Sequence, residues 1–334
     1  MKIGICGTGT VASRISDTIV QMNDPEITLY TCATSPGFDC REFAEKYGYA
    51  KISDSFDELM RDPEVDLVYI AVPNHLHYRM CMQAIACGKN LVCEKPFSVR
   101  VSECREVLAA AKEKHLFVSE ALWPRFLPAY QRIQEEIAAG RIGELVSGEI
   151  VMLDNVMFLE RVKSLATGGG ATLDGGPYIY GAMTAFFGTD IAGVESHVRK
   201  LDTGVDAEVN AVITYHSGVQ VTVRQTLDIP REQHDEYVKI VGTKGSIRMD
   251  AVSNPREVVI CDEAGNPVKT LDIPPQIRFR GMPPVSGYEY EWCAFAQALR
   301  EGKTECSEAP QAATEAISRV MSQILDGAGI SFPF

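Results

Sequence analysis

Residues 2–12 read Lys2-Ile3-Gly4-Ile5-Cys6-Gly7-Thr8-Gly9-Thr10-Val11-Ala12. The residues before Gly7 predict a buried strand, and apolar residues recur at helical spacing from Val11 to Met22. In a G-x-G-x-x-A turn between strand and helix, the first glycine allows a tight turn and the second lets backbone approach a pyrophosphate. The small third residue lets the helix pack on the strand, and the helix N-terminus favours phosphate. The stretch therefore predicts a dinucleotide site with contacts from Gly7, Thr8, Gly9, Thr10, Val11 and Ala12.

The end of the second predicted strand, residues 27–34, bears on which dinucleotide is bound. An acidic residue at this place would hold the ribose 2′-hydroxyl of NAD. Thr34 and Ser35 stand there instead, and their small side chains leave room for a 2′-phosphate. Arg14 and Arg41 are candidate partners for that phosphate. We therefore expect NADP as the cofactor, with NAD as the alternative.

Composition sets the broad class of the protein. The chain has 334 residues, which is enough for two domains, and its 46% hydrophobic and 23% charged residues are typical of a soluble globular protein. A net charge of -13 argues against a general nucleic-acid-binding surface. No run is apolar enough to span a bilayer, and no secretory signal pattern is visible. The ten cysteines match neither C-x-x-C nor a zinc spacing, so we expect reduced thiols in a cytoplasmic protein.

Helical and strand patterns alternate through the first part of the chain. Apolar strand patterns at residues 67–72, 91–93 and 116–119 are separated by helical ones. This alternation predicts a parallel, doubly wound sheet with right-handed crossovers, whose ligands lie outside the carboxyl ends of the strands. The alternation ends in residues 120–126. We therefore expect a Rossmann-type domain at residues 1–122 and a substrate-binding domain at residues 123–334.

The residues after the strand at 67–72 lie at the expected ligand edge. They suggest cofactor contacts from Val72, Pro73, Asn74 and His77. His75 and His77 form a His-x-His pair, which could also indicate a metal site or helix capping. No third ligand lies nearby in the sequence, so we expect no metal.

The pattern changes character after Gly143. Strand patterns cover residues 145–153, 194–198, 207–216, 220–227, 237–241, 246–249 and 258–261. Several are joined by hairpin signals, which predicts a large, mostly antiparallel open sheet in an α+β domain. Two predicted helices, residues 288–300 and 310–325, close the chain.

Residues 91–96, Leu-Val-Cys-Glu-Lys-Pro, deliver a charged pair to the end of a short buried strand. Lysine and glutamate are rarely buried unless they are paired. Glu94 and Lys95 are therefore either part of a surface turn or part of a site at the ligand edge, and the surrounding alternation favours the site.

A glycine-rich loop at residues 168–170 precedes a second candidate site. Asp174 has the character of a helix N-cap, and Pro177 suits the first turn of that helix. Tyr178 would then project from the first turn, although an ordinary amphipathic helix would also carry a tyrosine there.

Together these motifs resemble the glucose–fructose oxidoreductase / inositol dehydrogenase family (Gfo/Idh/MocA). The resemblance covers essentially the whole chain, and Glu94-Lys95-Pro96 is its most specific part. Residues 120–128 and Tyr178 are most similar to the branch of dimeric dihydrodiol dehydrogenases and NADP-dependent xylose dehydrogenases. Many other members carry histidine at the position of Tyr178, which argues against the inositol dehydrogenase branch.

The resemblance implies hydride transfer between nicotinamide and a carbonyl or alcohol of a sugar, polyol or dihydrodiol. It implies that Tyr178 is the general acid/base, that Lys95 assists it, and that the Lys95–Pro96 bond is cis. A lysine ammonium near a phenol favours the phenolate and stabilises charge on the substrate oxygen. It also implies a homodimer or a dimer of dimers, built through the second sheet.

Other residues have less definite roles. Glu94 would position Lys95 or the ribose, and Asp174 would either orient substrate hydroxyls or cap its helix. Trp123 and Arg125 would line the nicotinamide or substrate pocket.

Two other functions fit this fold. A non-catalytic regulator that binds dinucleotide would not need both Lys95 and Tyr178, and an NAD-dependent glycosidase would prefer NAD. The sequence does not name the substrate or the direction of the reaction.

Overall fold

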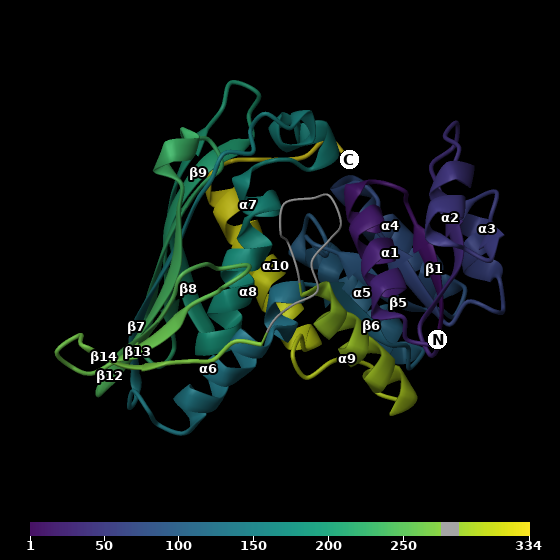
Figure 1. Ribbon diagram of the computed structural model, residues 1–334. Helices are drawn as coiled ribbons and strands as arrows, with labels where there is room; N and C mark the ends of the chain where they lie inside the picture. The colour runs from purple at the N-terminus through teal and green to yellow at the C-terminus, as the bar shows by residue number, and fades with distance from the viewer. Residues whose placement is uncertain (275–286) are drawn as a thin grey trace. The chain divides into compact units, whose positions relative to one another are not determined.

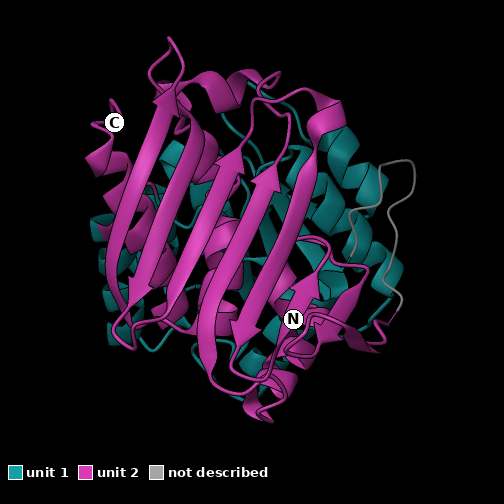
Figure 2. Cartoon of the chain, turned by 90° about the vertical axis from the view of Figure 1, so that its left-hand side faces the viewer, with its two compact units in different colours: residues 1–98, 102–123, 276–311 teal, residues 99–101, 124–275, 312–334 magenta. Residues whose placement is uncertain are grey.

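The computed structural model describes residues 1–274 and 287–334. The chain divides into two compact units (Figure 2). Unit 1 comprises residues 1–98, 102–123 and 276–311, and unit 2 comprises residues 99–101, 124–275 and 312–334. In the described parts of the chain, no helix is both long and apolar enough to cross a membrane.

The described strands of unit 1 form a six-stranded parallel sheet in the order β3-β2-β1-β4-β5-β6 (Figure 1). This arrangement confirms the predicted doubly wound sheet. The strands are β1 (Lys2–Cys6), β2 (Thr28–Ala33), β3 (Lys51–Ile52), β4 (Leu67–Ile70), β5 (Asn90–Glu94) and β6 (Val118–Ala121). The main helices are α1 (Thr10–Met22), α2 (Arg41–Tyr47), α3 (Phe56–Arg61), α4 (His77–Ala86), α5 (Val101–Glu113) and α9 (Tyr288–Arg300).

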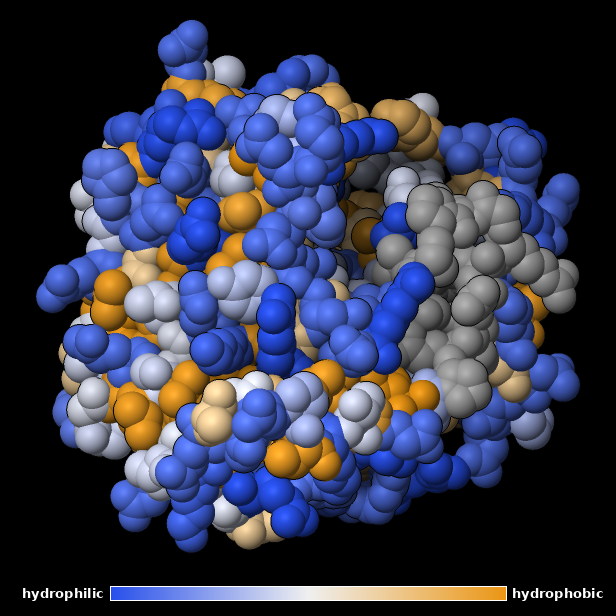
Figure 3. All heavy atoms as spheres, turned by 60° about the vertical axis from the view of Figure 1, so that its left-hand side comes forward, coloured by the Kyte–Doolittle hydropathy of each residue, from blue (hydrophilic) through white to orange (hydrophobic). Residues whose placement is uncertain are grey.

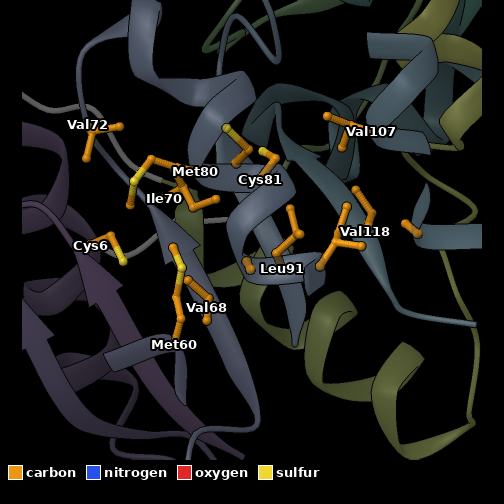
Figure 4. Close-up of a cluster of buried hydrophobic side chains, with 14 of the residues drawn as sticks. Cys6, Met60, Val68, Ile70, Val72, Met80, Cys81, Leu91, Val107 and Val118 are labelled. Atoms are coloured by element: carbon orange, nitrogen blue, oxygen red, sulfur yellow. The ribbon is translucent and has the colours of Figure 1, made fainter. Parts of the chain in front are cut away.

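Helices cover both faces of this sheet because its strands are apolar on both sides. On one face, Val68 and Ile70 of β4 join a core with Met80 and Cys81 of α4 and Val107 of α5 (Figure 4). Successive side chains of a strand point to opposite faces. Between those two residues, Tyr69 therefore faces the other way, and its ring lies 5.3 Å from that of Trp292 on α9.

The position of α9 corrects the predicted domain division. The sequence analysis assigned everything after residue 122 to the second domain, whereas α9 belongs to unit 1. The reason is its buried aromatic face. Trp292 packs against Tyr69, and Phe295 lies 6.0 Å from Phe117, just before β6.

The described strands of unit 2 form an eight-stranded sheet in the order β14-β13-β12-β11-β7-β10-β9-β8. Neighbouring strands are antiparallel except for β7 and β10, so the predicted mostly antiparallel sheet is confirmed. The strands are β7 (Leu145–Leu153), β8 (Ile191–Lys200), β9 (Asp206–Tyr215), β10 (Gln220–Thr226), β11 (Asp235–Gly242), β12 (Gly245–Met249), β13 (Val258–Cys261) and β14 (Pro267–Thr270).

Helices of unit 2 lie behind one face of its sheet in the view of Figure 2. They are α6 (Pro128–Ala138), α7 (Ala171–Asp174), α8 (Gly176–Phe187) and α10 (Gln311–Gly327). Helix α8 packs on β7 and β10. Gly148 of β7 permits this approach, since a Cβ there would lie 2.4 Å from the ring of Phe187.

From the side shown in Figure 3, hydrophobic residues form small groups among hydrophilic ones.

The hairpin between β11 and β12 in unit 2 depends on Gly242, the last residue of β11. A Cβ on Gly242 would lie 2.1 Å from the carbonyl oxygen of Ile142, which accepts the N–H of Lys244 at 2.8 Å. We expect Gly242→Ala to destabilise the protein by about 1–3 kcal/mol, because backbone must shift to make room. Urea unfolding would measure the change.

Gly193→Ala is the matched control, because a Cβ at this strand glycine of the same sheet meets no atom within 4 Å. Equal stability of the two variants would contradict the steric argument.

Candidate functional site

The glycine turn of unit 1 has one crowded glycine and one open one. Gly7 has a φ of 111° and donates its N–H to the carbonyl of Ala33 at 2.9 Å. A Cβ on Gly7 would lie 2.3 Å from the carbonyl oxygen of Ala71, whereas a Cβ on Gly9 would meet no atom within 4 Å. Gly7 is thus required by the fold, while Gly9 leaves space above the turn.

The start of α1 offers hydrogen-bond donors beside that space. Gly9 is the N-cap residue and provides no side-chain cap. The first N–H groups of a helix have no partner within the helix, and they carry the positive end of its dipole. The open space at Gly9 and these donors fit the pyrophosphate of a dinucleotide.

The predicted cofactor residues of unit 1 gather at one edge of its sheet. In parallel strands all carboxyl ends lie at the same edge, and here they are followed by Gly7, Thr34, Val72 and Lys95. Thr8 Oγ1 and Thr34 Oγ1 are hydrogen-bonded at 3.1 Å, which ties the glycine turn to the end of β2.

The two candidate arginines for a 2′-phosphate differ in position. Arg41 is exposed and pairs with Asp39 just after β2, at 2.7 Å between Nη2 and Oδ2. Arg14 instead lies near Glu94 at the end of β5, where burial raises the pKa of Glu94 and the charge of Arg14 partly opposes that rise. Since β5 lies on the far side of β1 from β2, this favours Arg41 over Arg14 as the phosphate partner.

Glu94 is buried and has hydrogen-bond donors at both carboxyl oxygens. Tyr69 donates its hydroxyl to Oε1, and the backbone N–H of Lys95 lies 3.2 Å from Oε2. Burial raises the pKa of Glu94, while these bonds and the nearby charges of Lys95 and Arg14 oppose that rise. The Lys95–Pro96 peptide bond is cis, as the resemblance implied.

His77 has a structural role that the sequence analysis did not predict. Its ring is buried, with Nδ1 2.7 Å from the carbonyl of Pro96 and Nε2 2.8 Å from that of Val72. Burial lowers the pKa of His77. Both ring nitrogens therefore face backbone at the ligand edge, and the contact of His77 with cofactor stays a prediction. Asn74 begins the short 3-10 helix that precedes His77.

Trp123 and Arg125 fall in different units. Trp123 is buried in unit 1, with its ring 5.1 Å from that of Tyr288. Arg125 is buried in unit 2 and donates from Nη1 to the carbonyl of Gly181 at 2.9 Å and to Thr184 Oγ1 at 2.7 Å. Arg125 therefore anchors α8, the helix that carries Tyr178, and its role toward cofactor stays a prediction.

The predicted N-cap at Asp174 is wrong. Asp174 is the last residue of α7, its N–H bonds to the carbonyl of Gly170, and Gly175 stands at the start of α8. Its carboxylate instead pairs with Arg161 at 2.5 Å. Pro177 does lie in the first turn of α8, as predicted, and the half-buried Tyr178 follows it.

Two buried side chains that sequence reasoning missed hold the short helix α7. Asp206 Oδ2 accepts the N–H of Thr172 at 2.5 Å, and Gln225 donates to the carbonyl of Ala171 at 2.6 Å. Gly170 fits against this arrangement, since a Cβ there would lie 2.1 Å from Asp206 Oδ1. Both side chains come from strands, but only Gln225 interrupts an apolar alternation, that of Val221 and Val223, because Asp206 shares its side of β9 with Glu208 and Asn210. For Gln225, that interruption was the available signal.

Comparison with known proteins identifies the family. Residues 1–122 match the family model described as "Oxidoreductase family, NAD-binding Rossmann fold", and residues 130–248 match the "GFO/IDH/MocA C-terminal domain". The chain belongs to the Gfo/Idh/MocA oxidoreductase family. It is therefore an NAD(P)-dependent oxidoreductase.

Relatives within the Gfo/Idh/MocA family match the chain over its full length. Trans-1,2-dihydrobenzene-1,2-diol dehydrogenase of Homo sapiens is 28% identical over 335 residues, which cover 100% of this chain and 98% of that protein. The enzyme of the same name from Xenopus laevis is 26% identical over 336 residues, with 99% of each chain covered.

Solved structures of other oxidoreductases share the fold. Aldose-aldose oxidoreductase from Caulobacter crescentus, in complex with glycerol, matches with a TM-score of 0.84 and 19% identity, covering 98% of this chain and 97% of that one. Levoglucosan dehydrogenase, in complex with NADH and levoglucosan, matches with a TM-score of 0.82, 21% identity and the same coverage. A 3-ketoreductase from Actinomadura kijaniata, in complex with NADP, gives 0.81 and 21%, again with that coverage.

We expect substitution of the two glycines of the turn to affect different properties, dinucleotide affinity at Gly9 and thermal stability at Gly7. Gly9→Ala should leave thermal unfolding unchanged but weaken dinucleotide binding about tenfold or more, because its methyl group would occupy the space next to the pyrophosphate. Gly7→Ala should lower the unfolding temperature, because its methyl group would collide with Ala71. Titration calorimetry and thermal unfolding would separate the two effects.

Wild-type affinity in Gly9→Ala would contradict the placement of the pyrophosphate, and wild-type stability in Gly7→Ala would contradict the crowding at Ala71.

Proposed function

We propose that this protein transfers a hydride between the nicotinamide of NAD(P) and a carbonyl or alcohol carbon of a sugar, a polyol or a dihydrodiol. The observation that carries the proposal is the open space at Gly9. It lies above a helix N-terminus, at the sheet edge where Glu94 and Lys95 also lie. The bound cofactor supplies the hydride acceptor or donor, and the protein moves the proton.

Tyr178 is the proposed proton donor and acceptor, and Lys95 is its electrostatic partner. A phenol with a pKa of about 10 is a poor base near neutral pH. A lysine ammonium favours the phenolate and stabilises negative charge on the substrate oxygen. Two structural features support this assignment. Glu94 accepts a hydrogen bond from the backbone N–H of Lys95, and Arg125 donates one to the backbone of the helix that carries Tyr178.

The substrate class follows from the relatives and from Asp174. The named compounds of the relatives, a dihydrobenzenediol, levoglucosan and aldoses, all carry several hydroxyl groups. The carboxylate of Asp174 is half-buried beside Arg161, so it can accept hydrogen bonds from substrate hydroxyls. We assign Asp174 to substrate orientation.

The proposed cofactor is NADP, with NAD as the alternative. Thr34 and Ser35 bring no negative charge to the end of β2, and Arg41 lies nearby. Both side chains of the ion pair between Arg41 and Asp39 are exposed, so Arg41 can exchange the carboxylate for a phosphate at a small cost in free energy.

We also propose a cytoplasmic homodimer. The ten cysteines are free thiols, which is typical of a reducing compartment. The proposed dimer contact is the face of the unit 2 sheet opposite to α6, α8 and α10. That face is open toward the viewer in Figure 2.

Removal of the proposed proton donor should abolish most of the turnover. We expect Tyr178→Phe and Lys95→Met each to lower kcat about 10²–10⁴-fold, since positioned acid–base groups contribute that much. Cofactor binding should persist in both variants. The assay is absorbance of the reduced cofactor, with a panel of aldoses, keto-sugars and dihydrodiols.

Tyr180→Phe is the matched control, because this tyrosine of the same helix is fully buried and its hydroxyl has no hydrogen-bond partner among the described residues. Near wild-type turnover in Tyr178→Phe would refute the assignment. Wild-type protein that binds dinucleotide but turns over none of the panel would favour a regulator.

The choice of cofactor can be tested at Arg41. Arg41→Ala should weaken NADPH binding about tenfold, the effect of one charge-assisted hydrogen bond, and leave NADH binding unchanged. Asp39→Asn should strengthen NADPH binding, because it frees Arg41. Equal effects of Arg41→Ala on both cofactors would contradict the NADP assignment.

A further inference from the structure

Glu291 is a buried acid that the proposed mechanism does not use. It lies on α9, its side chain is 0% exposed, and neither carboxyl oxygen has a hydrogen-bond partner among the described residues. A buried carboxylate without donors is strongly disfavoured. Its neutral form dominates, and burial, together with the charge of Glu94, raises the pKa of Glu291 well above its ordinary value.

Glu291 and Glu94 belong to one buried cluster within unit 1. Trp292, next to Glu291, stacks against Tyr69, whose hydroxyl is donated to Glu94. Burial raises the pKa of Tyr69, and the charges of both glutamates add to that rise, which places its hydroxyl near the two carboxyl groups.

The two carboxyl groups have unequal support. Glu94 has donors at both oxygens and the charges of Lys95 and Arg14 nearby, whereas Glu291 has no donor among the described residues. Two coupled acids in a buried site resist a second negative charge. The hydrogen-bond donors therefore favour the negative charge on Glu94 and the proton on Glu291.

The other titratable groups around Glu291 do not change this balance. Tyr69 of β4 and Tyr288 of α9 are neutral phenols near pH 7. Burial raises the pKa of the Cys306 thiol to about 12, and the charge of Glu291 adds to that rise.

The cluster lies in the nicotinamide half of the fold. A dinucleotide spans this sheet type with its pyrophosphate at the first turn, one nucleotide over each half of the sheet. Thr34 and Ser35, which are predicted to lie on the adenine side, follow β2, so the nicotinamide half of a bound dinucleotide would lie over β4 and β5, where Glu94 ends β5. Oxidised nicotinamide carries one positive charge more than reduced nicotinamide.

We propose that Glu291 makes cofactor binding sensitive to redox state, releasing its proton when the oxidised cofactor binds and keeping it when the reduced cofactor binds. This inference rests on the proposed function, because it requires a nicotinamide cofactor. The positive ring compensates the second negative charge of the pair. In this step the O–H bond of the Glu291 carboxyl group breaks, the electron pair stays on its oxygen, and the proton passes to the buffer.

The test is proton release on binding. Titration calorimetry of wild-type protein with NADP⁺ and with NADPH, in buffers of different ionisation enthalpy, gives the number of protons released. We expect release with NADP⁺ only, so that its affinity rises with pH by up to about tenfold per pH unit relative to NADPH. Glu291→Gln, which is neutral and similar in shape, should abolish this difference.

Glu301→Gln is the matched control, because Glu301 follows α9 at the surface and pairs with Lys303. It should release protons as the wild type does. Equal proton release by wild type and Glu291→Gln, with both cofactors still bound, would overturn this inference alone. Failure to bind either cofactor would refute the proposed function.

Thermal unfolding separates this role from a purely structural one. The folded protein holds the proton of Glu291 above the pH at which the unfolded chain loses it, so this group lowers stability as pH rises. Glu291→Gln should therefore flatten the dependence of unfolding temperature on pH without cofactor. An unchanged dependence would show that Glu291 does not hold a proton, and it would also overturn the inference.

Discussion

A parallel sheet places the carboxyl ends of all its strands at one edge, and the chemistry of unit 1 depends on that constraint. The strand order sets β1 between β2 and β4, so the turn after β1 lies where the two halves of the sheet meet. Gly7 fits there only because it has no side chain, and Gly9 keeps the space above α1 open. The glycine turn, Thr34 and Glu94 thus lie at the same edge of the sheet because its strands are parallel.

Burial of charge is the second physical theme of this edge. Tyr69 and a backbone N–H donate to Glu94, whereas Glu291 has no such donor among the described residues, and burial favours its protonated form. Proteins rarely keep a buried acid that lowers stability unless the site uses it. Because only Glu94 has hydrogen-bond donors among the described residues, Glu291 can gain or lose its proton when a ligand binds.

In unit 2, long-range contacts position the short segment that carries Asp174 and Tyr178. Asp206 and Gln225, both on strands of the sheet, form hydrogen bonds with the backbone of α7. Arg125 donates a hydrogen bond to a backbone carbonyl of α8. Side chains of a site keep their geometry only when the surrounding side chains lock them. The glycines around α7 serve the same end, because they let backbone lie directly against these polar groups.

The sequence alone determined the elements whose signals are local. Strand periodicity, the glycine turn and the hairpins predicted both sheets, and the family resemblance carried by Glu94-Lys95-Pro96 implied the cis bond. The N-cap at Asp174 was wrong because its carboxylate pairs with Arg161 instead, and no local pattern showed that the ring of His77 would meet the carbonyls of Val72 and Pro96.

Only the tertiary structure shows that α9 belongs to unit 1 and that Glu291, Asp206 and Gln225 are buried. Their roles depend on contacts between residues far apart in the sequence, and no local pattern encodes which buried polar group will meet which donor.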